Sequence, residues 1–406
     1  MSAQLKDGYK QSEAGVIPED WSAATVGEYF DIQLGKMLDA EKNSGVHKPY
    51  LGNRAVQWGQ INISDLPTMA MSTTDIARYR LKHGDLLVCE GGEVGRAAIW
   101  ESPIAECYYQ KALHRLRPIR EFNTALMQAL LQYWVNANSL SNFVTQTSIA
   151  HFPKEKFQIV PLPVPPMKEQ EAIASALTDM EDLISSLDQL IAKKRDIQQA
   201  AMQQLVTGQC RLPGFSGVWE VKPLRALGNT YGGLAGKTKN DFGHGEARYI
   251  PFMNVMTDTV IDASWLEPVD VAPDEAQNLA KKGDLFFNGS SETPEEVGFC
   301  SVLLEEIPNL YLNSFCFGFR FNTSARVNGL FFAYWFRSKA GRAVMSVLAQ
   351  GATRYNIAKS AFMQLEIPQP SEEEQTAIAT VLSDMGAELA ALEARRDKAR
   401  EGLNNR

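Results

Sequence analysis

The sequence predicts an α+β protein in which two similar β-rich modules are separated by two long antiparallel coiled-coil helices, with pseudo-two-fold internal symmetry. The main observation is that one helix-like segment occurs twice. EQEAIASALTDM begins at Glu169 and EQTAIATVLSDM begins at Glu374, with eight of twelve positions identical and an offset of 205 in a chain of 406 residues. A repeat of this length indicates duplication of a whole domain and not a solenoid of short units.

Shorter motifs recur in the same order in both halves, at offsets between 198 and 205. Such a shared order is what a tandem duplication with small insertions produces. The matched motifs are Trp21 and Trp219, Gly35-Lys36 and Gly236-Lys237, Gly84-Asp85-Leu86 and Gly283-Asp284-Leu285, Val94-Gly95 and Val297-Gly298, Tyr133-Trp134 and Tyr334-Trp335, and Phe157 and Phe362.

The first module, residues 1–165, mixes short apolar runs with turn residues. The run from Asp85 to Cys89, followed by Glu-Gly-Gly, is an example and predicts a short strand and a turn. A helical stretch is expected from about Asn123 to Phe143. The module is therefore predicted to be α+β.

The second module, residues 209–369, repeats this order. Strand-like runs are expected at Asp284 to Phe287 and at Phe315 to Phe321, followed by a helical stretch from about Gly329 to Leu348. Each module ends in a proline-rich run, PLPVPP in the first and IPQP in the second. Proline is tolerated just before or at the start of a helix, so both runs predict a rigid joint leading into a long helix.

The long helices are predicted at residues 166–208 and 370–406, and both carry a 4-3 heptad repeat, the pattern of a coiled-coil seam. A helix packed on its own module is the alternative, which would usually give a wider apolar stripe. Because the second helix ends the chain while the first leads to the second module, the pairing is predicted to be antiparallel. The seam positions are Ile173, Leu177, Met180, Ile184, Leu187 and Ile191 in the first helix, and Ile378, Leu382, Met385, Leu389 and Leu392 in the second.

Composition narrows the class of protein. The net charge of −8 argues against a simple nucleic-acid binder, but most of the excess acid lies on the two helical regions and leaves both modules nearly neutral. The chain alone should therefore bind a polyanion weakly, and a partner that adds positive surface would fit. No apolar run is long enough for a membrane span, and the first residues do not form a signal peptide. Five cysteines without a CxxC pair suggest a reducing cytoplasm.

Catalytic motifs are absent from the sequence, which favours a non-enzymatic chain. There is no Asn-Pro-Pro-Tyr/Phe motif for adenine methylation, no HExxH and no GxSxG. The segment from Tyr231 to Thr238 resembles a P-loop, but its first glycine is one place late, and a lysine-bearing loop or an ordinary turn explains it better. The five histidines lack metal-ligand spacing, so no metal is expected.

Several segments together resemble a known family. A module that opens near IPEDW and continues with PYLGNRAVQWGQI, GDLLVCEGGEVGR and YYQKALHRLRP, before LPVPPMKEQEAIASALTDM, is similar to the specificity subunit of Type I restriction–modification systems. The resemblance covers nearly the whole chain. It implies that residues 1–165 and 209–369 are target recognition domains for the two halves of a split DNA site. Residues 166–208 and 370–406 would be the helical regions that separate them.

The resemblance also implies partners. These would be double-stranded DNA with a bipartite site, two modification (methyltransferase) subunits docked on the helices and, through them, restriction (nuclease-translocase) subunits. The chain itself would hold no cofactor, since the modification subunits would bind S-adenosylmethionine.

Polar and basic side chains on turn-rich stretches are the candidates for DNA contact, because such side chains suit phosphates and base edges. Solvated surface loops and strand faces are the alternative for each of them. One polar loop, near His151 and near Asn356, falls at the same place in both modules but differs in sequence, as expected for two readers of different targets. The candidates are Lys36, Lys42, Arg54, Gln57, Trp58, Arg96, Gln110, Lys111, His114, Thr147, His151, Lys237, Lys239, Ser290, Ser291, Arg354, Tyr355 and Asn356.

Two other functions remain open at this stage. A self-sufficient methyltransferase would bind S-adenosylmethionine directly, which the missing motifs disfavour. A protein-binding scaffold with duplicated domains and no DNA readout would agree with the acidic charge.

Overall fold

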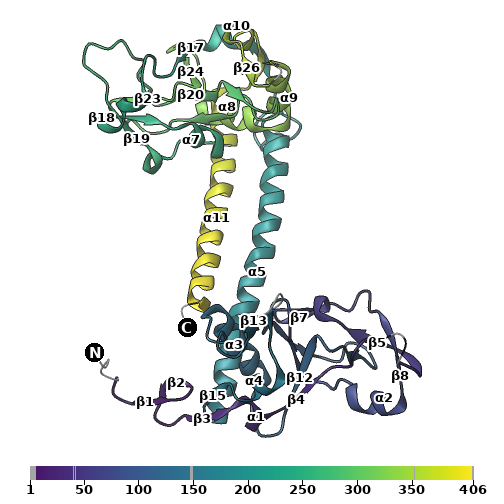
Figure 1. The fold of residues 1–406 in the computed structure, drawn as a ribbon. Helices are drawn as coiled ribbons and strands as arrows, with labels where there is room; N and C mark the ends of the chain where they lie inside the picture. The colour runs from purple at the N-terminus through teal and green to yellow at the C-terminus, as the bar shows by residue number, and fades with distance from the viewer. Residues whose placement is uncertain (1–5, 40, 42, 147–149, 352, 405–406) are drawn as a thin grey trace. The chain divides into compact units, whose positions relative to one another are not determined.

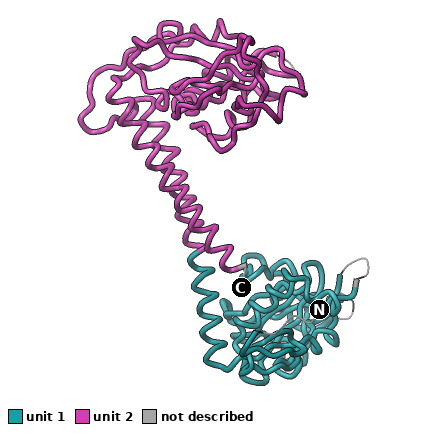
Figure 2. The backbone as a smooth tube through the Cα atoms, turned by 90° about the vertical axis from the view of Figure 1, so that its left-hand side faces the viewer, with its two compact units in different colours: residues 1–183, 405–406 teal, residues 184–404 magenta. Residues whose placement is uncertain are grey.

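The computed structural model describes residues 6–39, 41, 43–146, 150–351 and 353–404. The chain divides into two compact units, one that runs to Leu183 and one formed by Ile184–Asn404 (Figure 2). The division falls inside helix α5 (Met167–Leu205), which begins in unit one and continues into unit two.

Unit one is built mainly of short strands, with a few helices between them (Figure 1). Its strands are β1 (Tyr9–Ser12), β2 (Gly15–Pro18), β3 (Ser22–Thr25), β4 (Phe30–Leu34), β5 (Val46–Leu51), β6 (Val56–Gln57), β7 (Gln60–Ile61), β8 (Thr68–Met71), β9 (Asp85–Cys89), β10 (Ala97–Trp100), β11 (Tyr108–Tyr109), β12 (Leu113–Pro118), β13 (Thr145–Gln146), β14 (Ala150–His151) and β15 (Pro161–Val164). Its helices are α1 (Val26–Tyr29), the 3-10 helix η1 (Asn53–Ala55), α2 (Thr73–Tyr79), α3 (Thr124–Asn136), α4 (Lys154–Gln158) and the first part of α5.

Unit two repeats this composition and then ends in a long helix. Its strands are β16 (Glu220–Pro223), β17 (Gly228–Gly232), β18 (Phe242–Ile250), β19 (Glu267–Val269), β20 (Leu285–Asn288), β21 (Ser290–Ser291), β22 (Cys300–Val302), β23 (Leu310–Leu312), β24 (Cys316–Phe321), β25 (Ala349–Gln350), β26 (Tyr355–Ile357) and β27 (Glu366–Gln369). Its helices are α6 (Leu224–Leu227), η2 (Lys239–Asp241), α7 (Phe252–Thr257), η3 (Ala263–Trp265), α8 (Gly329–Arg337), α9 (Lys339–Val347), α10 (Lys359–Phe362) and α11 (Glu372–Asn404).

The sheets of the two units have the same topology, which confirms the predicted duplication. The four-stranded sheet has the order β10-β9-β12-β4 in unit one and β22-β20-β24-β17 in unit two. A three-stranded sheet, β11-β5-β8 or β23-β18-β19, joins one parallel and one antiparallel pair in each unit. A third, two-stranded sheet joins an early strand of each module to its last strand, β3 with β15 and β16 with β27.

The Gly-Asp-Leu motif has the same structural role in both units. Asp85 and Asp284 are each 1% exposed. Each carboxylate accepts a backbone N–H from the turn before it, from Lys82 at 2.7 Å and from Lys281 at 2.8 Å. The glycine in front of each aspartate has φ near +85°, a conformation that glycine adopts without strain. The motif therefore recurs because it builds the same turn at the start of a buried strand.

Val-Gly at Gly95 and Gly298 is a second motif with a clear physical cause. Both glycines have positive φ, +87° and +73°. A Cβ atom would lie 2.7 Å from a methyl carbon of Val135 in the first case and 2.3 Å from Cε of Met345 in the second. A larger residue would therefore adopt a strained backbone conformation and force these core side chains to shift.

One sequence match has a different register in the structure. The backbone N–H of Lys36 donates to Tyr109 O at 3.0 Å, and the equivalent bond in unit two comes from Leu234 to Leu312 O at 2.8 Å. The structural counterpart of Gly35 is therefore Gly233, and the predicted match with Gly236 is wrong. The error arose because glycine-lysine pairs occur close to this position in both halves.

The helical stretches differ in length from the prediction. Helix α3 ends at Asn136, and Asn138 follows with φ +53°, a left-handed conformation that ends helices. In unit two the predicted stretch is divided into α8 and α9 at Ser338. This residue is extended, and its hydroxyl accepts the N–H of Gly341 at 3.2 Å as the N-cap of α9.

Within unit two the second half of α5 pairs antiparallel with α11, as predicted (Figure 1). Residues later in α5 meet residues earlier in α11: Asp188 pairs with Arg400 at 2.8 Å, and Lys194 pairs with Glu388 at 2.8 Å. The amide of Gln198, further along α5, lies 3.5 Å from Leu382 O. The antiparallel coiled coil is thus confirmed where both helices belong to one unit.

The seam residues divide between two kinds of packing. Leu187, Ile191 and Leu389 are buried in the helix pair, whereas Ile184, Met385 and Leu392 are half-buried. Ile378 and Leu382 belong to the core of unit two. In unit one Ile173 packs on the core, and Leu177 and Met180 are half-buried. The start of each helix therefore packs on its own module, as the alternative interpretation proposed, and the heptad pattern serves pairing further along. Among the described residues no helix is long and apolar enough to cross a membrane.

Candidate nucleic-acid interface

The structure brings together two polar loops of unit two that are far apart in the sequence. Strand β21 pairs with β26, so that Ser290 lies opposite Asn356 and Ser291 lies opposite Tyr355. Strand β25 completes this small sheet. Arg354 and Asn356 are exposed, and the side chains of Ser290 and Ser291 are half-exposed. Four of the candidate residues in unit two thus form two neighbouring cross-strand pairs, with Arg354 next to them in sequence.

Unit one has the same arrangement with other side chains. Gly91 is bridged to His151, and His151 also lies opposite Thr145 in the β13–β14 pair. His151 therefore occupies the position of Asn356, and the predicted alignment of the two loops is confirmed. The His151 ring is half-exposed, with Nδ1 3.2 Å from Glu90 Oε2. Thr147, a further candidate on this loop, and Lys42 lie outside the described residues.

The two candidate lysines of the glycine-lysine pairs are held in ion pairs. Lys36 Nζ lies 2.9 Å from Asp75, and the side chain is 12% exposed. Lys237 is paired with Glu275 and is 7% exposed. The hydrogen bond from Lys237 lowers the pKa of Glu275 to about 2, with further help from Gln277 and the Ala272 N–H. Both lysines brace a loop in the free chain, so a DNA phosphate would have to compete with a carboxylate for them.

Unit one contains a cavity of about 530 Å³. Asn53, Arg54 and Gln110 line it together with Tyr50 and Asn62. The cavity shows that candidate residues from two separate segments, Arg54 and Gln110, face one space.

Arg96 stabilises the loop that contains Asn53 and Arg54. Its guanidinium donates to Asn53 O at 3.1 Å and pairs with Glu93, while its side chain is 12% exposed. The amide of Asn53 in turn donates to Gly91 O at 2.7 Å. The loop at 52–58 is therefore tied to the loop that bridges to His151, and Arg96 has a structural role in the free chain.

The remaining candidates differ in exposure. Arg54, Gln57 and Lys111 are exposed in unit one, as is Lys239 in unit two. Trp58 is half-buried and packs against the core of unit one. The exposed residues are available for contact with DNA, whereas the indole of Trp58 mainly supports the loop.

The prediction that His114 contacts DNA is wrong. Its side chain is 0% exposed, and Nε2 lies 2.7 Å from Phe152 O, to which an Nε2–H would donate. Burial lowers the pKa of this histidine. The alternation of polar and apolar residues in β12 suggested one solvated face. Phe152 and Phe157 cover that face of the strand at His114, with ring centroids 6.5 and 5.7 Å from the imidazole.

The P-loop-like segment has no phosphate-binding architecture. Tyr231 and the glycine after it lie in β17, and the segment ends at the three-residue 3-10 helix η2 and not at an α-helix. The hydroxyl of Tyr231 donates to the buried carboxylate of Asp284 at 2.6 Å. The start of the segment is therefore part of a sheet. In the part of the chain that the structure describes, no group of three or more His, Cys, Asp or Glu side chains could hold a metal ion.

Sequence reasoning missed three residues beside the interface. Lys154 and Lys359 occupy the first helical position of α4 and α10, directly after the reading loop of each unit. Their offset of 205 equals that of the Glu-Gln repeat, and this signal could have identified them. Phe315 lies on the turn before β24 and is 59% exposed. Its carbonyl oxygen accepts the backbone N–H of Gly289, the residue before strand β21. Only the register of the strands places Phe315 there.

Taken together, two copies of one α+β domain present different polar side chains at an equivalent loop, and each copy leads into a long helix. This arrangement defines a class of proteins that read two sites with related domains. The chain belongs to the family described as the Type I restriction modification DNA specificity domain, whose model matches residues 18–193 and 276–399. It is a DNA-specificity protein of the Type I restriction–modification class.

Relatives and solved structures agree with this family. The putative Type I restriction enzyme MjaX specificity subunit of Methanocaldococcus jannaschii is 23% identical over 50% of this chain, and the match spans 49% of that protein. The MjaVIII specificity subunit of the same organism is 22% identical over 95% of this chain and 90% of its own length.

Two crystal structures share the fold. The S subunit of a Type I system from M. genitalium has a TM-score of 0.53 and 14% identity, covering 99% of this chain and 97% of that one. The HsdS subunit from Thermoanaerobacter tengcongensis has a TM-score of 0.56 and 15% identity, covering 96% of both chains.

Proposed function

We propose that each module reads one half of a bipartite double-stranded DNA site through its polar loop, and that the paired long helices fix the spacing between the half-sites. The single observation that carries this proposal is the equivalence of His151 and Asn356. One fold occurs twice, and the same strand position carries different hydrogen-bonding side chains. Different side chains on a common scaffold are suited to reading different base sequences.

The chain is proposed to contribute recognition and no catalysis. Two modification subunits would dock on the helical regions, bind S-adenosylmethionine and methylate the DNA, and restriction subunits would join through them in the cytoplasm. The near-neutral charge of each module supports the need for such partners. Neutralisation of phosphates supplies most non-specific affinity for DNA, and this chain has few positive charges to spare for it.

The residues proposed to meet DNA are the sequence candidates whose side chains are exposed or half-exposed and are not already used to support a loop of the free chain. In unit one they are Arg54, Gln57, Gln110, Lys111 and His151. In unit two they are Lys239, Ser290, Ser291, Arg354, Tyr355 and Asn356.

The test is to exchange residues 211–369 for the same segment of another family member and to map methylated adenines across a genome. Cells would carry the chain with its own modification subunits, and the unmodified chain is the control. One half of the methylated site should change, while the other half stays the same. A change in both halves would contradict the assignment of one half-site to each module.

A further inference from the structure

The repeated Glu-Gln pair makes the same set of bonds in each unit. In unit one the indole Nε1 of Trp21 donates to Glu169 Oε2 at 2.9 Å. The next residue, Gln170, is buried; its Oε1 accepts the backbone N–H of Asn123 at 2.9 Å, and its Nε2 donates to Pro165 O at 2.9 Å. Asn123 is the N-cap of α3. Two consecutive side chains of α5 thus bind two separate parts of the domain.

Unit two repeats each bond with the equivalent residues. Trp219 Nε1 donates to Glu374 Oε2 at 3.0 Å. Gln375 Oε1 accepts the N–H of Asn328, the N-cap of α8, at 2.8 Å, and Gln375 Nε2 donates to Pro370 O at 2.8 Å. This correspondence gives the most conspicuous repeat of the sequence a structural role.

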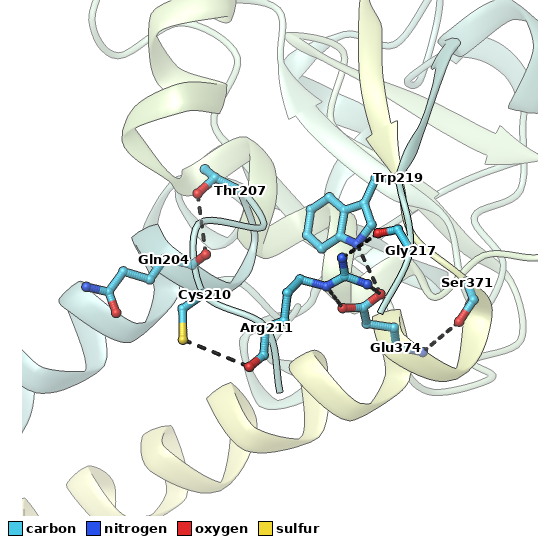
Figure 3. Close-up of polar contacts among 8 residues, drawn as sticks. All are labelled: Gln204, Thr207, Cys210, Arg211, Gly217, Trp219, Ser371 and Glu374. Atoms are coloured by element: carbon cyan, nitrogen blue, oxygen red, sulfur yellow. Dashed lines mark hydrogen bonds and ion pairs between the residues drawn. The ribbon is translucent and has the colours of Figure 1, made fainter. Parts of the chain in front are cut away.

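The two sets differ most at the glutamate, and Figure 3 shows this site in unit two. There Arg211 holds both carboxylate oxygens of Glu374, with Nη2 2.7 Å from Oε2 and Nε bonded to Oε1. The guanidinium also donates to Gly217 O at 2.8 Å and lies 5.3 Å from the centre of the Trp219 ring. Glu374 is only 2% exposed. In unit one, within the described residues, Trp21 is the side-chain partner of the half-exposed Glu169.

The geometry of a helix explains why this pair can fix an angle. Neighbouring side chains leave an α-helix about 100° apart, because a turn contains about 3.6 residues. Bonds from the Glu and the Gln therefore point in two directions and restrain rotation of the domain about the helix. Apolar packing of Ile173 or Ile378 on the same cores adds to this restraint, whereas the hydrogen bonds give it a defined direction.

We infer that the pairs Glu169-Gln170 and Glu374-Gln375 are positioning residues for DNA recognition, which set the angle at which each recognition domain presents its reading loop. We infer further that the first domain, held by Trp21 alone at its glutamate, is more easily reoriented than the second. This inference rests on the proposed function, in which the distance between two half-sites must be read. One added base pair rotates DNA by about 34–36°, so a looser domain angle should admit a spacer of the wrong length.

The experiment compares Trp21→Phe and Trp219→Phe in the full chain, each expressed with its modification subunits. Both substitutions keep an aromatic ring, but they replace the indole by a smaller phenyl ring and so remove the N–H donor together with part of the ring packing. The measured quantity is the share of methylated genomic sites whose spacer differs by one base pair from that of the unmodified chain. Trp21→Phe should raise this share by about tenfold, the factor that corresponds to loss of one hydrogen bond to a charged group. Trp219→Phe should change it by less than about twofold, because Arg211 keeps Glu374 in place.

Two further variants separate orientation from stability. The double variant Arg211→Met with Trp219→Phe removes the side-chain donors of Glu374 and should relax the spacer as Trp21→Phe does. Trp265→Phe, at a surface indole of unit two, is the matched control and should leave the spacer strict.

The possible outcomes are distinct. A strict spacer in Trp21→Phe at normal methylation would overturn the inference while leaving the proposed function intact. Loss of methylation at every spacing would mean that the bond maintains the fold and not the angle, and would also overturn it. The proposed function itself would fail if the unmodified chain gave no bipartite methylated site at all.

Discussion

Arg320 binds Asp284 through two parallel hydrogen bonds, Nε to Oδ1 at 2.9 Å and Nη2 to Oδ2 at 2.6 Å, in a carboxylate site that is almost closed to water. Arg117 and Asp85 make the same bidentate pair in unit one, with both bonds at 2.7 Å. The hydrogen bond with Asp284 raises the pKa of Arg320, and the one with Asp85 raises that of Arg117. Each pair joins the strand that begins at the Gly-Asp-Leu motif to the strand that lies beside it in the same sheet.

Replacing Asp284 with Asn should destabilise unit two by about 3 kcal/mol, because the Arg320 guanidinium would lose the carboxylate that balances its charge in a largely buried ion pair. The value lies at the low end for such pairs, since the Arg320 side chain is 38% exposed and water can solvate it. Urea unfolding followed by circular dichroism measures the change. Asp274→Asn, at an exposed position of the same unit, should change the free energy of unfolding by less than about 0.5 kcal/mol. Equal effects of both substitutions would contradict the role given to the pair.

Acid should weaken unit two in part through Glu275. Its pKa in the folded chain is lowered from 4.5 to about 2, first by the hydrogen bond from Lys237. A lowered folded pKa contributes stability that is present above the unfolded pKa and is lost as the pH falls through the folded value. The difference in melting temperature between the unmodified chain and Glu275→Gln should therefore shrink between about pH 4.5 and pH 2. A difference that stays constant over this range would show that the Lys237–Glu275 pair does not stabilise the fold.

Substitution in one reading loop should affect one half-site only. If His151 and Asn356 read bases, His151→Ala should relax specificity in the first half-site and Asn356→Ala in the second, each by about 1–3 kcal/mol for the base concerned. Methylation of site libraries with one randomised half measures this. Lys82→Ala, at an exposed lysine away from the loop, is a control that should leave both halves unchanged. Equal loss in both halves from a single substitution would count against separate readers.

The isolated chain should bind DNA weakly, and assembly with modification subunits should make binding tight and specific. The reason is that the chain has a net charge of −8 and both modules are nearly neutral. Little positive charge is therefore available to neutralise DNA phosphates. Gel-shift titrations of the chain alone and of the assembled complex, at two salt concentrations, measure the affinities. Tight, specific binding by the chain alone would refute this expectation.

Four residues inserted after Leu187, matched by four inserted after Arg396 in the helix that faces it, should lengthen the spacer. Each insertion adds about 6 Å of helix, comparable to nearly two base-pair steps of 3.4 Å. Both half-site sequences should stay the same, since the reading loops are untouched. Some loss of stability is expected, because four residues disturb the heptad register. Methylation mapping gives the spacer directly, and an unchanged spacer in an active variant would show that the helices do not set it.

The duplication, the α+β class and the coiled coil could be predicted from the sequence, because each is encoded by local order. The Glu-Gln repeat, the proline joints and the 4-3 spacing are visible without any contact between distant residues. The candidate interface was predictable only as a set of loops. The equivalence of His151 and Asn356 followed from an offset of 205, whereas the wrong match of Gly35 arose because glycine and lysine are common in turns.

The sequence alone determined that this chain contains one domain twice, each copy followed by a long helix, and thereby the family to which it belongs. Only the tertiary structure decided which polar residues are available at the surface. It buried His114 beneath Phe152, paired Lys36 with Asp75, and placed Trp21 against Glu169 across 148 residues of chain. The physical reason is that periodicity and motif identity are properties of neighbouring residues. Burial and hydrogen bonding of a single side chain depend instead on which distant segment packs against it.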